Sequence, residues 1–341
     1  MVEASTVGID LAKSVFQVHG SDRSGVVLFR KKLRRDQLLQ FMATLPRSLV
    51  AMEACSSAHY WAREIAAVGH DTKLIPPAYV KPFVKRQKND MADAEAICEA
   101  AQRPTMRFVQ GKSAQTQASA VVFRTRDLLV RQRTQLINAI RGHLTEFGYV
   151  VRKGAGHVGK LVEIITDPQS DIPAEARPVL AIIAQSLEGL QAQIAQLDRE
   201  IASRAKADPV AKRLMTIPGV GPVIATALVA LAPAAGTFRR GRDFAAWLGL
   251  VPRQHSSGGK ERLGRTTKMG ERSLRRLLIL GASSATKVAA RNPEKASAWL
   301  VGMLARKPRM LVTVALANKM ARIVWALMAH GGTYRAPAAA V

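Results

Sequence analysis

The stretch TVGIDLAK, residues 6–13, decides the fold, because it predicts a short apolar strand with an acid, Asp10, at its end. An ionised carboxylate is costly to bury unless a cation pairs with it. Several carboxylates that converge on one point are the usual ligands of a hard divalent cation. Asp10 alone fits an ordinary strand-end turn equally well, so the metal interpretation depends on further acids that reach the same point.

A regular order of strands and helices follows this stretch. Strands are predicted at residues 7–11, 15–19 and 26–32, a helix at 36–45, a strand at 49–52, a helix at 59–68 and a strand at 72–75. This is the order of the ribonuclease H-like fold, in which the first and fourth strands end side by side. Glu53 directly follows the fourth strand, so this fold brings it against Asp10.

Two more acids, Asp90 and Asp93, begin another predicted helix. Their three-residue spacing puts both carboxylates on one face, near the favourable N-terminal dipole. A basic segment precedes them and would steer a phosphodiester towards a metal site; its residues are Lys81, Lys85, Arg86 and Lys88. The alternative is a solvated basic loop followed by a capped helix.

The charge of the chain favours a polyanionic partner. The 341 residues carry 51 Lys and Arg against 25 Asp and Glu, a formal net charge of +26. From Pro209 to the end there are 22 Lys and Arg against four Asp and Glu, so +18 of the total lies there. Phosphates are the expected ligands, with an affinity that falls as salt rises. The length of 341 residues is enough for two or three domains, and the hydrophobic content of 48% predicts a globular chain.

The cysteines and the apolar segments bear on the compartment. Cys55 and Cys98 are the two cysteines and make neither a disulfide framework nor a metal site, which fits a reduced cytoplasm. The N-terminus does not resemble a signal peptide. The apolar runs contain prolines or the charged Lys319 and Arg322, so no membrane span is expected.

Long helices are predicted after Gly111. Residues 115–147 form one, and a second has a seam with steps of three and four residues: Leu180, Ile183, Leu187, Leu190, Ile194, Leu197 and Ile201. Such a seam needs a partner helix. The preceding helix or a second subunit would serve; we interpret the seam as a subunit contact that builds an oligomer.

Residues 212–231, KRLMTIPGVGPVIATALVAL, have the pattern of a helix-hairpin-helix motif. Gly219 and Gly221 would let the backbone approach a phosphate, and amides at the start of the next helix would bind it. A purely structural tight turn is the alternative.

A Gly-rich basic loop with two adjacent serines, Ser256 and Ser257, spans residues 251–270. A mobile phosphate-binding segment is the commoner meaning of such a composition. A nucleophilic serine would need a base or metal to activate it and cations for the charge that develops on phosphorus. His255 is a candidate base, although a surface loop histidine is the plainer interpretation. Helices at residues 273–288, 297–304 and 309–328 follow.

Taken in order, these motifs resemble the DEDD transposases of the IS110 insertion sequences and related DNA invertases. The resemblance runs from about residue 5 to about residue 330, and the motifs that carry it are GIDLAK (8–13), MEA (52–54), NDMADA (89–94), PGVGP (218–222), GLVP (249–252), SGG (257–259), KMG (268–270) and LR (274–275).

The resemblance implies an α/β plus all-α chain with four regions. These are a RuvC-like DEDD domain (1–111), a helical coiled-coil region (112–207), a C-terminal transposase domain with a helix-hairpin-helix-like motif and the catalytic serine (208–332), and a flexible tail (333–341). It also implies a bacterial cytoplasmic enzyme, nucleoid-associated when active, whose partners are double-stranded donor and target DNA and a structured bridge RNA. The oligomer would be a tetramer built from dimers.

The resemblance also assigns the site. Asp10, Glu53, Asp90 and Asp93 match the metal-binding tetrad, which would hold Mg²⁺, with Mn²⁺ as a substitute. Ser257 matches the serine that forms a covalent phosphoserine link to DNA, with Ser256 as the competitor in register. The candidate nucleic-acid-binding residues are Lys85, Arg86, Lys88, Gly219, Gly221, Arg253, Lys260, Arg262, Arg265, Lys268, Arg272, Arg275 and Arg276.

We therefore interpret the chain as an RNA-guided, Mg²⁺-dependent serine recombinase of a mobile element. The alternative is a RuvC-like junction-resolving nuclease in which the acids alone direct water to the phosphate. A nucleic-acid-binding protein without catalysis would suit the charge but leaves four placed acids unexplained.

Overall fold

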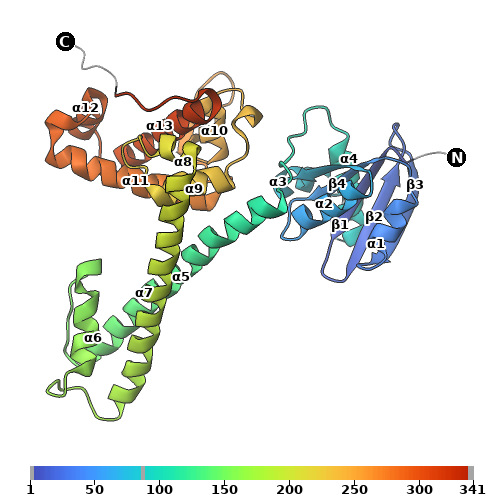
Figure 1. Cartoon of the computed structure of the whole chain (residues 1–341). Coiled ribbons are helices and arrows are strands. Elements are labelled where there is room, and N and C mark those ends of the chain that lie inside the picture. Colours follow the sequence, from blue (N-terminus) through green and yellow to red (C-terminus); the bar gives the residue numbers. More distant parts are fainter. Residues whose placement is uncertain (1–3, 86–88, 337–341) are drawn as a thin grey trace. The chain divides into compact units, whose positions relative to one another are not determined.

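A computed structural model of the chain describes residues 4–85 and 89–336 (Figure 1). They divide into two compact units at the junction between Ala118 and Ser119, within helix α5. The first unit contains a sheet, and the second consists mainly of helices.

The first unit has the predicted order of three strands, a helix, a strand, a helix and a strand. Its elements are β1 (Thr6–Leu11), β2 (Val15–Ser21), β3 (Val27–Arg34), α1 (Leu38–Ala43), β4 (Leu49–Glu53), α2 (Ala58–Ala67), β5 (Asp71–Ile75), α3 (Pro77–Val80), a 3₁₀ turn (Lys81–Phe83) and α4 (Asp90–Ala101). The strand and helix predictions for this unit are confirmed, with α1 shorter than expected.

The five strands form one sheet in the order β3-β2-β1-β4-β5. β2 is antiparallel to β1 and to β3, whereas β1, β4 and β5 run parallel. On one face, Val7 and Ile9 of β1 pack with α1 and α2, and on the other Ala51 of β4 packs with Ile97 of α4. Because side chains alternate along a strand, residues of β1 and β4 point in turn to α2 and to α4.

The second unit contains the long helices and the C-terminal helical core. Its elements are α5 (Ala114–Glu146), a 3₁₀ turn (Ala155–His157), α6 (Val158–Thr166), α7 (Ala176–Ala207), α8 (Pro209–Leu214), α9 (Pro222–Leu231), a 3₁₀ turn (Ala235–Thr237), α10 (Gly241–Trp247), β6 (Pro252–Gln254), β7 (Leu263–Thr266), α11 (Arg272–Arg291), a 3₁₀ turn (Pro293–Lys295), α12 (Ala298–Arg306) and α13 (Arg309–His330). Residues 251–270, expected to be a loop, contain the β6–β7 hairpin.

Within this unit, the apolar seam of α7 packs against the same chain. Leu180 and Leu187 lie in one core with Ile140 of α5 and Leu161 of α6, and Ile201 lies in another with the start of α5. The interpretation of these three seam positions as a subunit contact is therefore wrong. The reason is α6, a helix that was not expected from the sequence and that packs against α7 where a second subunit was expected.

We expect Leu187→Asp to destabilise this helical arm by about 3–5 kcal/mol, since the Leu187 side chain is completely buried. Thermal unfolding monitored by circular dichroism measures the loss. Ile182→Asp on the same helix is the control, because Ile182 is 65% exposed and should tolerate the change. A Leu187→Asp variant that stays folded but has a smaller mass by light scattering would instead show that the seam joins two copies.

α13 is, among the described helices, long and apolar enough to cross a membrane by length and composition alone. In this fold it packs against α10 and α11. Ala317, Met320 and Val324 of α13 are buried in the core of the second unit. Core packing therefore accounts for these apolar positions, whereas Met310 and Leu311 at the start of the helix are exposed.

The segment after α13 continues the folded unit at least to Tyr334. Its ring packs against the core, and its backbone N–H donates to Thr216 Oγ1 at 2.9 Å. The flexible tail from residue 333 stays a prediction, with Tyr334 making these contacts and residues 337–341 outside the described part of the chain.

Candidate functional site

The strands β1 and β4 bring Asp10 and Glu53 to one edge of the sheet. The two strands are parallel neighbours in which Ile9 pairs with Met52, so the next residue on each strand is the acid. Ile9 and Met52 face α1 and α2. By the alternation of a strand, Asp10 and Glu53 then face α4, and each is half-buried.

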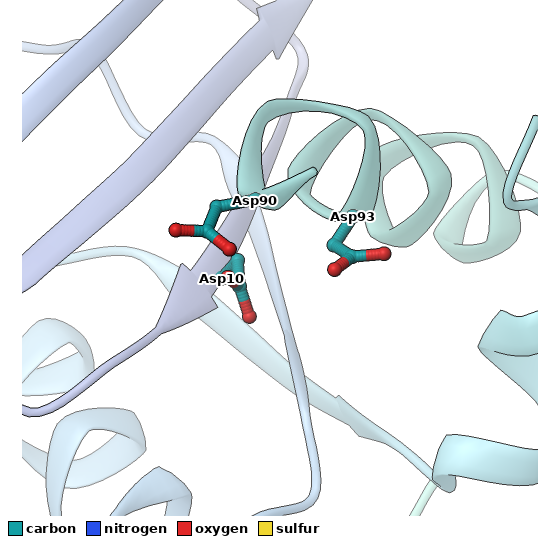
Figure 2. A group of neighbouring side chains, drawn as sticks. All are labelled: Asp10, Asp90 and Asp93. Atoms are coloured by element: carbon teal, nitrogen blue, oxygen red, sulfur yellow. The ribbon is translucent and has the colours of Figure 1, made fainter. Parts of the chain in front are cut away.

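The helix α4 brings two further acids to this edge. Asn89 caps the helix by accepting a hydrogen bond from Ala92 N at 2.7 Å, which fixes where the first turn begins. Asp90 and Asp93 lie in that first turn. Figure 2 shows Asp90 beside Asp10 at the end of β1, with Asp93 one turn further along α4. One carboxylate oxygen from each of these three residues lies within 4.8 Å of the others.

The crowded carboxylates alter one another's ionisation. Burial raises the pKa of Asp10 from 3.8 to about 6, and the charges of Asp93, Asp90 and Glu53 add to the effect. Burial and the charge of Asp93 also raise the pKa of Glu53, although Glu53 lies outside the 4.8 Å group. Half-buried acids whose repulsion raises their pKa values fit a cation, because a cation would offset both the desolvation and the repulsion.

Gly8 allows α4 to lie this close to β1. A Cβ atom on Gly8 would overlap the Ala94 carbonyl oxygen and lie 2.6 Å from the Cys98 backbone nitrogen. No structural role was predicted for Gly8 from the sequence. A glycine inside an apolar strand was the available signal, since it often marks a close backbone approach.

Gly8→Ala should push α4 away from β1 and so separate Asp90 and Asp93 from Asp10. We expect a loss of about 1–3 kcal/mol in stability from the overpacking, and at least about tenfold weaker Mn²⁺ binding. Thermal unfolding and isothermal titration calorimetry measure the two effects. Gly111→Ala is the control, because a Cβ there meets nothing within 4 Å. Mn²⁺ binding as tight as in the unmodified chain would refute this role for Gly8.

The basic segment before α4 is only partly described. Lys85 Nζ forms an ion pair with Glu95 Oε1 at 2.6 Å, and this contact raises the pKa of Lys85. Arg30 binds the other oxygen of Glu95 at 3.1 Å. Lys85 is thus engaged with α4, while Arg86 and Lys88 lie outside the described residues.

The two serines of the β6–β7 hairpin differ in their contacts. Ser256 Oγ accepts a hydrogen bond from Arg262 N at 3.0 Å and donates one to Gln254 Oε1 at 3.2 Å. Ser257 lies at the tip, where its carbonyl accepts from Lys260 N at 3.1 Å. The Ser257 side chain is exposed, and its hydroxyl has no hydrogen-bond partner in the part of the chain that the structure describes. Positive φ angles at Gly258 (56°) and Gly259 (76°) explain the two glycines of the turn.

The candidate basic residues fall into two groups. The side chains on the hairpin, its following loop and the start of α11 are exposed; they belong to Arg253, Lys260, Arg262, Arg265, Lys268 and Arg272. Arg275, by contrast, donates to the carbonyl oxygens of Leu248 (3.0 Å) and Met269 (2.7 Å), and Arg276 forms an ion pair with Asp127. Arg275 and Arg276 therefore have structural contacts within their own unit.

The two candidate glycines of the helix-hairpin-helix segment have different surroundings. Gly219 has a φ of 86°, and a Cβ there would lie 2.5 Å from the Gly281 carbonyl oxygen of α11. Close packing thus explains Gly219. Gly221 is exposed, precedes α9 as its N-cap and has open space around its Cα, so its side of the turn is accessible.

Comparisons with known proteins identify the family. A profile of IS110-type DEDD transposases, described as "Transposase", matches residues 7–148, and one described as "Transposase IS116/IS110/IS902 family" matches residues 211–297. The chain is 49% identical over 334 residues to a "Probable family 20 transposase" of Pseudomonas aeruginosa, covering 97% of this chain and 98% of that protein. The chain belongs to the IS110/IS116/IS902 family of transposases.

Two further transposases are similar to almost the whole chain. A "Putative transposase y4pF/y4sB" of Sinorhizobium fredii is 47% identical over 331 residues, 96% of this chain and 85% of that protein. A "Transposase for insertion sequence element IS1328" of Yersinia enterocolitica is 39% identical over 334 residues, 98% and 99% of the two chains. The chain is thus an insertion-sequence transposase, and Asp10, Glu53, Asp90 and Asp93 lie within residues 7–148, the range that the first profile matches.

Proposed function

We propose that this transposase cuts and rejoins DNA by phosphoryl transfer, with Ser257 as the nucleophile and Asp10, Glu53, Asp90 and Asp93 as the ligands of a divalent cation. The gathering of Asp10, Asp90 and Asp93 within 4.8 Å carries the proposal. Cutting and rejoining DNA is what membership in a transposase family implies. The serine nucleophile, the bound metal ion and the RNA guide are proposals that go beyond the family assignment.

The four acids would hold Mg²⁺, with Mn²⁺ as a substitute. Such a cation supplies charge stabilisation to the attacking and leaving oxygens of a phosphoryl transfer. The chain's own contribution is positional: β1 and β4 fix Asp10 and Glu53, while the Asn89 cap and the Gly8 contact fix the first turn of α4.

The contacts of the hairpin support Ser257 over Ser256. The Ser256 hydroxyl already stabilises the hairpin, whereas the Ser257 hydroxyl has no hydrogen-bond partner among the described residues and can meet an external one. In the proposed step Ser257 Oγ loses its proton and bonds to phosphorus, and one deoxyribose oxygen leaves and takes a proton. Rejoining reverses the exchange, so no nucleotide hydrolysis is required. Exposed Arg253, Arg262 and Lys268 are candidates to bind the phosphate.

The remaining assignments extend this proposal. The strand order β3-β2-β1-β4-β5, with β1 and β4 parallel, supports a ribonuclease H-like fold for the first unit. We propose that the enzyme acts in the bacterial cytoplasm on double-stranded donor and target DNA, that a structured bridge RNA selects the sites, and that four copies assemble so that the acids of one act with Ser257 of another.

A metal-dependent nuclease without a serine nucleophile is the second candidate. It is favoured by one observation: the acids belong to the first unit and Ser257 to the second. In this candidate a water molecule replaces Ser257 as the attacking group, and strands are cut without a covalent link to the protein.

Incubation of the full chain with donor DNA, target DNA, co-purified RNA and Mg²⁺ tests the proposal. We expect joined products and a protein–DNA adduct that survives denaturation, both abolished by EDTA. Sequencing of the co-purified RNA tests the guide. Cut but unjoined DNA without an adduct would favour the nuclease, and equal activity in EDTA would refute the metal.

A further inference from the structure

An open cleft of about 560 Å³ lies in the first unit, outside the carboxylate group. Three segments that are distant in the sequence line it: the β1–β2 turn, the β3–α1 connection and the first turn of α2. Its principal side chains belong to Lys13, Ser14, Arg34, Arg35, Tyr60 and Trp61. None of the roles assigned above uses these residues.

The topology puts this cleft at the same edge of the sheet as Asp10 and Glu53. Lys13 follows Asp10 by three residues, so the two Cα atoms are at most about 11 Å apart. Val15 pairs with Arg34, and Arg35 N donates to Ser14 O at 3.0 Å, which joins the two basic segments. The acids face α4, whereas the cleft opens on the side of α1 and α2.

The cleft is positively charged. Lys13, Arg34 and Arg35 are exposed, and the acid that lines it is Asp36, which pairs with Arg34 at 3.3 Å. Within residues 4–85 and 89–336, neither Lys13 nor Arg35 forms an ion pair with a carboxylate. Two cations without a counter-charge at the mouth of a cleft favour a phosphate ligand.

The cleft also offers flat aromatic surface. The Arg35 guanidinium lies 4.9 Å from the centroid of the Trp61 ring. Tyr60 is 43% exposed and contacts Trp61 edge-on, with ring centroids 5.2 Å apart. Trp61 is 3% exposed, and its Nε1–H has no hydrogen-bond partner among the residues that the structure describes. An aromatic ring beside cations binds an unpaired base by stacking.

We propose that this cleft binds a single-stranded segment of the DNA next to the phosphate that the carboxylates act on. Lys13 and Arg35 bind the backbone, and an unpaired base stacks on Tyr60. The volume of about 560 Å³ admits a nucleotide, and stacking on Tyr60 requires a base that is not paired in a duplex. The inference rests on the proposed function, because the position beside the acids makes the strand that is cut the expected occupant.

Photo-crosslinking of the full chain to a single-stranded DNA that carries iodouracil tests the proposal, with EDTA present and salt high enough to screen diffuse binding. We expect the adduct to map to Tyr60 or Trp61 by mass spectrometry. Tyr60→Ala and Arg35→Ala should each lower the crosslinking yield and the affinity about tenfold.

Matched controls separate the cleft from the general charge of the protein. Arg23→Ala removes an exposed cation at the opposite edge of the sheet, and Tyr79→Ala removes another exposed tyrosine of the same unit. Equal losses in the control variants, adducts that map elsewhere, or displacement by RNA in preference to DNA would overturn the proposal. Since EDTA prevents metal chemistry, the crosslink can succeed while the catalytic proposal fails, and the reverse.

Discussion

Asp10→Asn is expected to abolish DNA cutting and, at the same time, to stabilise the metal-free chain. Asp10 is half-buried, and its loss removes one of the three carboxylates that lie within 4.8 Å of one another. We expect activity to fall at least about a hundredfold, as when other groups that hold or stabilise a reacting centre are removed. Cleavage of labelled DNA measures this loss.

The expected gain in stability follows from the direction of the pKa shift. Burial first, then the charges of Asp93, Asp90 and Glu53, raise the pKa of Asp10 from 3.8 to about 6 in the folded chain. The folded state therefore binds more protons than the unfolded state between these values. This preferential protonation of Asp10 stabilises the folded state. The stabilisation is fully present below pH 3.8 and is lost as the pH rises through about 6.

At pH 8 the ionised Asp10 thus destabilises the metal-free fold, and an asparagine relieves this by about 1 kcal/mol after allowance for solvent screening. Thermal unfolding in EDTA at pH 8 and pH 4 measures the difference, which should shrink at the lower pH. Asp71→Asn is the contrasting control, because Arg47 lowers the pKa of Asp71 and the change should not stabilise the chain. A less stable Asp10→Asn variant at pH 8, or one that still cuts DNA, would contradict the metal assignment.

Ser257→Ala is expected to eliminate the protein–DNA adduct and all joined products. The hydroxyl is the proposed nucleophile, so its removal leaves no group to form the covalent link. Because the side chain is exposed, the folded state should be unchanged within about 0.5 kcal/mol. Denaturing gel electrophoresis of labelled DNA detects the adduct, and Mn²⁺ titration verifies that the carboxylate group still binds metal.

Ser256→Ala is the matched control one residue away. It removes the hydrogen bonds to Gln254 and Arg262, so the hairpin should loosen and the rate should fall, while the adduct still forms. An adduct that persists in Ser257→Ala and vanishes in Ser256→Ala would move the nucleophile by one residue. Cutting that survives in Ser257→Ala without joining would support the nuclease instead.

Much of the site could be predicted from local sequence. An apolar strand that ends in Asp10, a second that ends in Glu53, and a helix that begins at Asp90 are local patterns, and parallel neighbouring strands bring the first two together. The contacts of the Arg residues of α11 could not be predicted from local sequence. Exposure cannot be read from charge alone, and Arg275 and Arg276 turn out to bind Leu248, Met269 and Asp127 within the chain.

By itself, the sequence determined the order of strands and helices along the first unit, the resemblance to the family, the excess of positive charge and the candidate acids, because all of these reside in short patterns and composition. Only the tertiary structure decided that α6 covers Leu187 and that Gly8 sets the approach of α4. It also decided that the Ser256 hydroxyl has hydrogen-bond partners, whereas that of Ser257 has none in the described part of the chain. Each of these depends on contacts whose partners the local pattern does not specify, and packing, not propensity, selects them.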